Sequence, residues 1–204
     1  NEFNFKVVYA SSSSIYGNPE KIPIVENDQK NPINPYAVTK LDDEKLAIKY
    51  AQMGVRIIGL RYFNVFGEKQ SSTYAGVIKK FVKKVRNNEA PIINGDGQQT
   101  RDFVYVGDVV NANILAMNSN IAHEFFNIGT ATTITILELA NLIIKSFNFS
   151  LKPILGPELP GDVKITKADI GLVQNMLNWK PETRIEKWLE STIKNGTNLD
   201  LLTE

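Results

Sequence analysis

The chain has 204 residues, with 23 lysines and arginines against 22 aspartates and glutamates, one histidine and no cysteine. Without cysteine it can form no disulfide, no thiolate nucleophile and no cysteine-ligated zinc site, and one histidine excludes a multi-histidine centre, so we expect no metal site. The formal net charge of +1 argues against a nucleic-acid partner, and the lack of a long apolar run or signal peptide argues against a membrane and favours a cytoplasmic location.

The predicted secondary structure alternates between strands and helices. The apolar residues 5–10 indicate a buried strand, which four serines and a loop rich in proline and asparagine follow. A helix is expected from Pro35 to about Met53, where Gly54 ends it, and a second strand at 55–62. Further strands are expected at 103–106 and 125–128, and further helices at 75–89, 108–117, 134–147, 169–177 and 185–194. This order is typical of βαβ units and a parallel sheet.

Tyr36 and Lys40 are the first candidates for chemistry, because a chain without cysteine leaves acid–base work to tyrosine, lysine and carboxylates. Their spacing places a phenol and an ammonium group side by side on one helix face. A free tyrosine has a pKa of ~10 and is a poor base at neutral pH. A cation ~5 Å away, at an effective dielectric constant of ~20, contributes ~3 kcal/mol, or about two pKa units. A lysine and an oxidised nicotinamide ring together could therefore make the phenolate accessible near neutral pH.

Ser12 gives this pair a context. The Tyr-x-x-x-Lys spacing alone is a weak signal, and its plain alternative is an exposed helix face. Ser12 follows the first predicted strand, and ligands of open α/β sheets bind at the carboxyl ends of strands. A serine hydroxyl there can both donate to and accept from a substrate hydroxyl. The alternative for the serine run is a polar loop that caps the strand.

Several ordered segments resemble one known family. They are residues 8–17 (VYASSSSIYG), 34–40 (NPYAVTK), 61–67 (RYFNVFG), 95–109 (GDGQQTRDFVYVGDV), 126–130 (FNIGT), 160–163 (PGDV) and 179–181 (WKP). The first two are similar to the extended short-chain dehydrogenase/reductase family, and the others resemble its NAD-dependent epimerase/dehydratase branch, which acts on sugar nucleotides. Within that branch, the UDP-glucose 4-epimerases are the most similar, and the resemblance covers nearly the whole chain.

The resemblance implies an NAD-dependent reaction with three catalytic residues. Tyr36 would take the proton from the sugar 4-hydroxyl while C4 passes hydride to NAD, and Ser12 would hydrogen-bond the 4-oxygen. Lys40 would bind the nicotinamide ribose and lower the pKa of Tyr36, while Tyr62 would approach the nicotinamide. The 4-keto intermediate would then rotate and take hydride back on its other face. The implied result is epimerisation at C4 of UDP-glucose or UDP-galactose, and the N-acetylhexosamine forms remain open.

A set of substrate contacts is implied in the same way. The residues that would hold the sugar, the diphosphate or the uridine are Ser12, Ser13, Tyr36, Asn64, Val77, Asn94, Arg101, Asp162 and Thr166. Asn64 and Arg101 would bind the diphosphate, Arg101 through its forked guanidinium. Val77 would pack near the uracil, Asn94 would face the nucleotide, and Asp162 would accept from the ribose hydroxyls. The plain alternatives are a salt bridge from Arg101 to Asp102 and a turn residue at Asp162.

Departures from the family pattern narrow the reaction. Related 4,6-dehydratases carry an acidic pair after the Ser12 position, and Ser13 and Ser14 cannot replace it as acid and base, which disfavours dehydration. The family commonly has an arginine, a second diphosphate ligand, where this chain has Leu159. Thr166 stands where a bulky tyrosine is said to exclude N-acetyl groups, so its small side chain predicts that an N-acetylhexosamine nucleotide fits.

The expected fold is α/β, a Rossmann-type parallel sheet whose N-terminal strands are missing, with a smaller α/β C-terminal substrate-binding domain. Residues 1–66, joined by 103–129, would belong to the NAD-binding domain, and 67–204 mainly to the nucleotide-sugar domain. No Gly-x-x-Gly-x-x-Gly turn occurs for the NAD pyrophosphate, so the chain is interpreted as part of a longer enzyme and as inactive alone. The resemblance also implies a homodimer through the helix that carries Tyr36.

Two other functions stay open. One is another nucleotide-sugar reaction of the family, by a reductase, decarboxylase, 5-epimerase or dehydratase. Net NADH formation or consumption would identify a net redox reaction such as that of a reductase, since 4-epimerisation shows none. The other is a non-catalytic nucleotide-sugar-binding fragment, which would keep Asn64, Arg101 and Asp162 without turnover. The basic run within the predicted helix 75–89 is amphipathic and indicates a solvated face, in line with the absence of a nucleic-acid partner.

Overall fold

The computed structural model describes residues 5–70, 76–159 and 161–195. Its elements in chain order are β1 (Lys6–Ser12), the 3₁₀ helix η1 (Ser13–Tyr16), α1 (Pro35–Gln52), β2 (Arg56–Tyr62), β3 (Asn64–Phe66), α2 (Val77–Arg86), β4 (Ile92–Asn94), β5 (Thr100–Arg101), β6 (Phe103–Tyr105), α3 (Val106–Asn118), β7 (His123–Ile128), β8 (Ile134–Thr135), α4 (Ile136–Ser146), β9 (Ile154–Gly156), α5 (Gly171–Leu177) and α6 (Ile185–Asn195).

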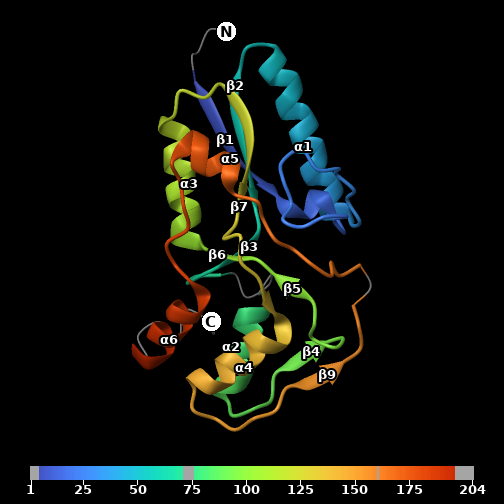
Figure 1. Cartoon of the computed structure of the whole chain (residues 1–204), viewed down its shortest axis with the longest axis vertical. Coiled ribbons are helices and arrows are strands. Elements are labelled where there is room, and N and C mark those ends of the chain that lie inside the picture. Colours follow the sequence, from blue (N-terminus) through green and yellow to red (C-terminus); the bar gives the residue numbers. More distant parts are fainter. Residues whose placement is uncertain (1–4, 71–75, 160, 196–204) are drawn as a thin grey trace.

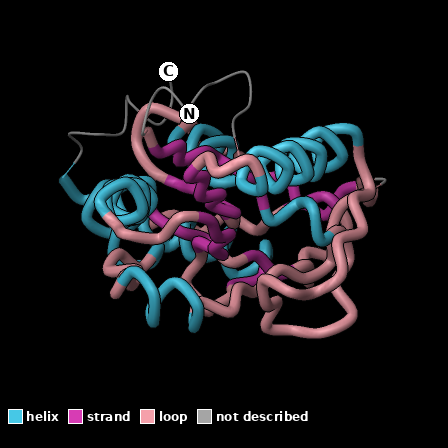
Figure 2. Tube along the Cα trace, turned by 90° about the horizontal axis from the view of Figure 1, so that it is seen from above, coloured by secondary structure: helices cyan, strands magenta, loops and turns pink. Residues whose placement is uncertain are grey.

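The largest sheet has three parallel strands in the order β1-β2-β7. Helix α1 packs against β1 and β2 from one side, and α3 covers the same strands from the other side, where α5 packs against β7 (Figure 1). Seen from above, the strands run between helices on either side (Figure 2). The predicted α/β fold with a parallel sheet is confirmed.

Of the three groups of buried apolar side chains among the described residues, two are large. One surrounds the three-stranded sheet and includes Ile58, Phe126 and Trp179. The other lies between α2, α4 and α6 and includes Val82 and Leu139. Figure 1 shows the corresponding two lobes, with the paired short strands β4 and β9 at the edge of the lower one. The segment between β9 and α5 returns from the lower lobe to the sheet.

Local sequence signals explain where the helices begin. The side chain of Asn34 accepts from the backbone N–H of Ala37 at 2.8 Å and caps α1, and Pro35 occupies the first turn. In α4, Thr135 and Glu138 form a reciprocal capping box. The helix predicted over 134–147 begins only at Ile136. The two residues before it form β8, which pairs with β5, and Thr135 is the N-cap of the helix.

Two further expectations are corrected. The first strand does not end at Ala10, because Ser11 and Ser12 continue its ladder with β2. The basic face of α2 is not entirely solvated: Lys79 is only 5% exposed and its Nζ donates to the backbone carbonyl of Gln70 at 2.9 Å. Among the described helices, none combines the length and the apolar character that a bilayer crossing needs.

Candidate active site

Ser12 and Tyr62 lie side by side at the carboxyl edge of the sheet. Each is the last residue of its strand, and the β1–β2 register pairs them directly. The Ser12 hydroxyl accepts from the backbone N–H of Ser14 at 3.2 Å and so caps η1, of which Ser13 is the first residue. The serine run therefore caps the end of the strand while its Ser12 hydroxyl remains at the ligand-binding edge.

Lys40 reaches the same edge from α1. Its Nζ donates to the backbone carbonyl of Ala10 at 2.9 Å and lies 3.3 Å from Oδ2 of Asp43. Tyr36, one turn earlier, is 57% exposed, and within the described residues its hydroxyl makes no hydrogen bond. The structure thus holds the lysine against β1 and leaves the tyrosine hydroxyl available to a ligand.

Tyr62 is held by a residue that the sequence did not single out. Asn113 of α3 donates from Nδ2 to the Tyr62 hydroxyl at 2.8 Å. Burial raises the pKa of Tyr62, although the hydrogen bond to Asn113 opposes the shift. The phenol therefore stays neutral at physiological pH and can act there only as a hydrogen-bonding or packing group. No local motif marks Asn113, since its partner lies far away in the sequence.

Arg101 and Asp162 form an ion pair. Nη2 of Arg101 donates to Oδ1 of Asp162 at 2.6 Å, and Nη1 donates to the carbonyl of Thr100 at 2.8 Å. The arginine side chain is 10% exposed and the aspartate 41%. The alternative pairing of Arg101 with Asp102 is wrong, because Asp102 points into the protein interior and accepts from other groups.

Asp102 joins three segments around the site. Its carboxylate accepts from the backbone N–H groups of Thr130, Ala131 and Ala168 at 2.7–3.1 Å, and from the Thr130 hydroxyl. Burial raises the pKa of this carboxyl, and the hydrogen bonds oppose the shift. Its own backbone N–H donates to Oγ1 of Thr166 at 3.1 Å, so the aspartate also fixes the loop after β9.

Asn64 and Thr166 meet beside Asp102. The Thr166 hydroxyl donates to Oδ1 of Asn64 at 3.4 Å, and the Asn64 backbone N–H donates to the Asp102 carbonyl at 3.0 Å. Two of the predicted substrate contacts, far apart in the sequence, therefore share one hydrogen-bonded group.

A cavity of about 290 Å³ collects further predicted residues. Asn94, Leu159 and Asp162 line it together with Gly95, Asp96, Gln98, Gln99, Glu158, Val163, Lys164 and Ile165. Val77, the first residue of α2, does not line this cavity but packs against the lower apolar group. Pro160 of the predicted Pro-Gly-Asp segment lies outside the described residues.

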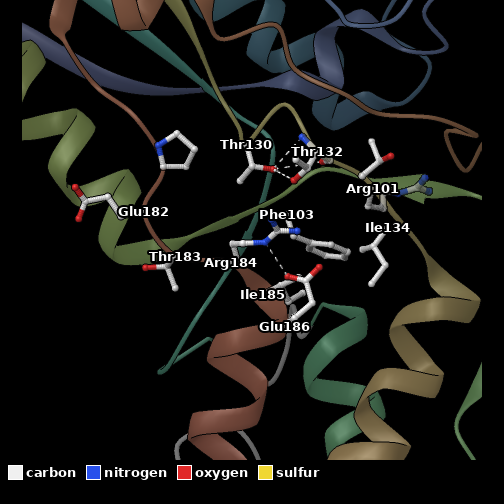
Figure 3. Close-up of a pocket in the computed structure, with 12 residues that line it drawn as sticks. Arg101, Phe103, Thr130, Thr132, Ile134, Glu182, Thr183, Arg184, Ile185 and Glu186 are labelled. Carbon is white, nitrogen blue, oxygen red and sulfur yellow. Dashed lines mark hydrogen bonds and ion pairs between the residues drawn. The ribbon is translucent and has the colours of Figure 1, made fainter.

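A second cavity, of about 260 Å³, lies on the other side of Arg101. Figure 3 shows Thr130 and Thr132 above Phe103, Arg184 beside it and Glu186 below it, where the chain enters α6. Since Arg101 lines this cavity and Asp162 lines the first, their ion pair lies between the two.

The sheet edge fits part of a dinucleotide. A lysine cation and a half-buried phenol stand at the carboxyl ends of β1 and β2, where Lys40 would hold a nicotinamide ribose and Tyr62 would approach the nicotinamide. The sequence contains no glycine-rich turn for the pyrophosphate. Among the described residues, no three carboxylate or histidine side chains gather as a metal would require.

Comparisons with known proteins agree with this geometry. Residues 1–129 match the NAD dependent epimerase/dehydratase family. A putative UDP-glucose 4-epimerase of Methanocaldococcus jannaschii is 39% identical over 191 residues, which cover 92% of this chain and 62% of that protein.

Solved structures give the same result. The UDP-N-acetylglucosamine 4-epimerase from Methanobrevibacter ruminantium M1, in complex with UDP-N-acetylmuramic acid, superposes with a TM-score of 0.88 at 35% identity, covering 95% of this chain and 63% of that one. For the UDP-glucuronic acid 4-epimerase from Bacillus cereus in complex with UDP-glucuronic acid and NAD, the TM-score is 0.86 at 29% identity, with coverages of 97% and 61%. The chain thus spans a little over three fifths of the length of these relatives.

Proposed function

Because the chain belongs to the NAD dependent epimerase/dehydratase family, whose cofactor is NAD, we propose that it carries the catalytic and substrate-binding residues of a nucleotide-sugar 4-epimerase. The proposed substrates are UDP-glucose and UDP-galactose. The observation that carries the proposal is the meeting of Ser12, Lys40 and Tyr62 at the carboxyl edge of one parallel sheet.

The proposed chemistry is a proton transfer coupled to oxidation at the sugar C4. The exposed Tyr36, as the phenolate, takes the proton of the 4-hydroxyl and becomes the neutral phenol, and Ser12 holds the same oxygen by a hydrogen bond. Lys40, held at the same strand end, would bind the nicotinamide ribose. When bound, NAD supplies the acceptor, and later the donor, of a hydride. Rotation of the 4-keto sugar before its reduction inverts C4, and Tyr36 returns the proton.

The proposed nucleotide site lies around the Arg101–Asp162 ion pair. Arg101 would bind the diphosphate together with Asn64, and Asp162 would accept from the ribose hydroxyls, so a bound nucleotide would replace or share the present ion pair. Asn94 lines the same cavity as Asp162, which supports a nucleotide-facing role. Val77 packing near the uracil and Ser13 near the sugar belong to the same proposal.

The proposed domain division follows the two apolar groups only in part, because Trp179 belongs to the group around the sheet and Phe103 to the lower one. Residues 1–66 with 103–129 would form part of the NAD-binding domain, and 67–204 mainly the nucleotide-sugar domain. We also propose a homodimer through α1, because Leu46 and Tyr50 of this helix and Met53, which caps its C-terminus, recur at helical spacing and are 45–63% exposed.

The test is an assay on the polypeptide at its natural length, with the 204-residue chain compared beside it. We expect NAD-dependent conversion of UDP-glucose to UDP-galactose without net NADH, and loss of conversion but retention of UDP binding in Tyr36→Phe. The 204-residue chain alone is expected to bind UDP without turnover. Net NADH formation or consumption, release of CO₂ or loss of water would instead identify another reaction of the family. UDP binding by the natural-length protein without any turnover would identify a binding protein.

A further inference from the structure

A buried ion pair connects the elements that carry the proposed catalytic residues. Nε and Nη2 of Arg61, on β2, donate to Oε1 and Oε2 of Glu44, on α1, each at 2.8 Å. The Ser11 hydroxyl, on β1, donates to the same Glu44 Oε1 at 2.6 Å. The side chains of Glu44 and Arg61 are both 4% exposed. We call Ser11, Glu44 and Arg61 the buried ion-pair cluster.

Arg61 makes two further hydrogen bonds beside those to Glu44. Nη1 of Arg61 donates to the Tyr16 hydroxyl at 2.7 Å and to the Glu26 carbonyl at 2.8 Å. The guanidinium also lies 5.0 Å from the centre of the Phe125 ring. Burial alone would lower the pKa of Arg61, but the hydrogen bonds and opposite charge of Glu44 raise it above its usual value. The charge is therefore held, in one geometry, by groups from several elements.

Each member of the cluster stands next to a proposed site residue. Ser11 precedes Ser12 on β1, and Arg61 precedes Tyr62 on β2. Glu44 follows Lys40 by one helical turn on α1. Successive strand residues point to opposite faces, so the cluster holds the α1 face of the sheet while Tyr62 meets Asn113 on the α3 face. A shift of the cluster would move all three site residues relative to one another.

Stability alone explains such a cluster poorly. Burying two charges costs desolvation energy that their attraction often only offsets, so replacement by apolar residues is commonly neutral or stabilising. A bidentate arginine–carboxylate pair does, however, fix the relative position of its two elements closely. Helix α1 has few other buried anchors among the described residues, since apart from Glu44 only Ala37 and Ala47 are buried there.

We infer that Ser11, Glu44 and Arg61 are positioning residues, which set the distance between α1 and the sheet so that Lys40 and Ser12 lie correctly for catalysis. This inference rests on the proposed function, because the positions matter for a reaction at the Ser12–Tyr36–Lys40 site. The three residues would touch neither substrate nor cofactor and would act only through the residues beside them.

The test uses the natural-length protein and the variants Ser11→Ala, Glu44→Gln and Arg61→Lys. Ser11→Ala removes one hydrogen bond and leaves the ion pair, so it keeps the experiment decisive if Glu44→Gln fails to fold. The matched control is Asp42→Asn, which breaks the exposed Asp42–Lys45 pair on the same helix. For Ser11→Ala and Arg61→Lys we expect kcat to fall about tenfold or more, with KM and the Kd for UDP within about twofold of the wild type.

A second readout does not depend on turnover. Hydrogen exchange at the backbone amides of the first turns of α1 should accelerate in Ser11→Ala and not in Asp42→Asn. A wild-type kcat in Ser11→Ala and Arg61→Lys, or equal effects in Asp42→Asn, would overturn the inference. If the wild type converts no nucleotide sugar while the exchange at α1 still responds to Ser11→Ala, the proposed function fails and the anchoring of α1 stands.

Discussion

Arg101 and Asp162 face each other across an ion pair of 2.6 Å between Nη2 and Oδ1, although 61 positions separate them in the sequence. The pair joins β5 to the loop after β9 and divides two cavities. The arginine is nearly buried and therefore already desolvated and oriented before any ligand arrives. Such preorganisation lowers the cost of binding an anion at this position.

We expect Arg101→Ala to weaken UDP binding about 10- to 100-fold, since hydrogen bonds to charged groups contribute about 1.5–3 kcal/mol. Arg101→Lys should recover only part of the loss, because an ammonium group cannot reproduce the forked geometry. Titration calorimetry with UDP measures both. The control is Arg184→Gln, which removes an exposed arginine of the second cavity that lies 3.5 Å from Glu186. Equal affinities for the Arg101→Ala variant and the wild type would contradict the proposed diphosphate contact.

A substitution at Leu159 should strengthen UDP binding and so test the proposed diphosphate site. This side chain is 55% exposed and lines the same cavity as Asp162, where the family commonly has an arginine. Leu159→Arg should tighten UDP binding about tenfold and make it more sensitive to salt. Leu159→Gln, similar in length but uncharged, should change the Kd less than twofold. An unchanged affinity in the arginine variant would place the diphosphate elsewhere.

Thr166 is expected to decide which sugars fit. The wild type should turn over both UDP-glucose and UDP-N-acetylglucosamine. Thr166→Tyr should exclude the N-acetyl group sterically and lower kcat/KM for UDP-N-acetylglucosamine, relative to kcat/KM for UDP-glucose, at least about tenfold. Because the threonine hydroxyl also bonds Asn64 and the Asp102 N–H, Thr166→Val is the matched control: it removes these bonds and keeps the volume. The valine variant should be less stable but keep the ratio. A wild type that uses only UDP-glucose would contradict the hypothesis.

The sequence predicted the elements whose patterns are long. The helix α1 carries its own start and stop signals, Asn34 with Pro35 and later Gly54, and β2 is a seven-residue, mostly buried strand, so both lie within two residues of their expected ends. The short strands β3, β4, β5, β8 and β9 were missed, because two or three residues have no periodicity and such strands exist only through their partners.

The site shows the same division between local and distant signals. Ser12 and Lys40 meet the same strand end as expected, because a βαβ unit brings the ends of its parts to one edge. Arg101 pairs with Asp162 and not with the adjacent Asp102. The Asp102 carboxylate accepts hydrogen bonds from backbone N–H groups that are distant in the sequence, which local spacing could not predict. The buried role of Glu44 was not predicted. Its helical spacing from Lys40 could have indicated it, because this spacing places a charged residue on the helix face that packs against the sheet.

Gly129 lies where a side chain has no room. A Cβ there would stand 2.6 Å from Cβ of Ala168 and 3.0 Å from Oδ2 of Asp102. We expect Gly129→Ala to lower the free energy of unfolding by about 1–3 kcal/mol through overpacking. Gly156→Ala is the control, because its Cβ would meet its nearest neighbours at an ordinary 3.4 Å. Urea denaturation of both variants measures the difference, and a Gly129→Ala variant as stable as the wild type would show that the Asp102 hydrogen-bond group tolerates displacement.

The capping box of α4 predicts a defined pH dependence of stability. The backbone N–H and hydroxyl of Thr135 donate to Glu138 at 2.9 Å and lower the pKa of its carboxyl. A depressed carboxyl pKa contributes stability that is complete above the unfolded-state pKa of about 4.3 and is lost as the pH falls through the folded-state value. Glu138→Gln keeps a capping oxygen but not the charge, which at an exposed helix N-terminus contributes about 0.5 kcal/mol.

The difference in the free energy of unfolding between the wild type and Glu138→Gln is measured by urea denaturation at a series of pH values. It should therefore be largest near neutral pH and fall toward zero in acid. The control is Asp42→Asn, whose carboxylate pairs at 2.8 Å with the exposed Lys45 inside α1, away from the first turn of that helix. Its effect on stability should be near zero throughout, as is typical of exposed pairs. A difference for Glu138→Gln that stays constant with pH would mean that the amide is the poorer hydrogen-bond acceptor and that the charge contributes nothing.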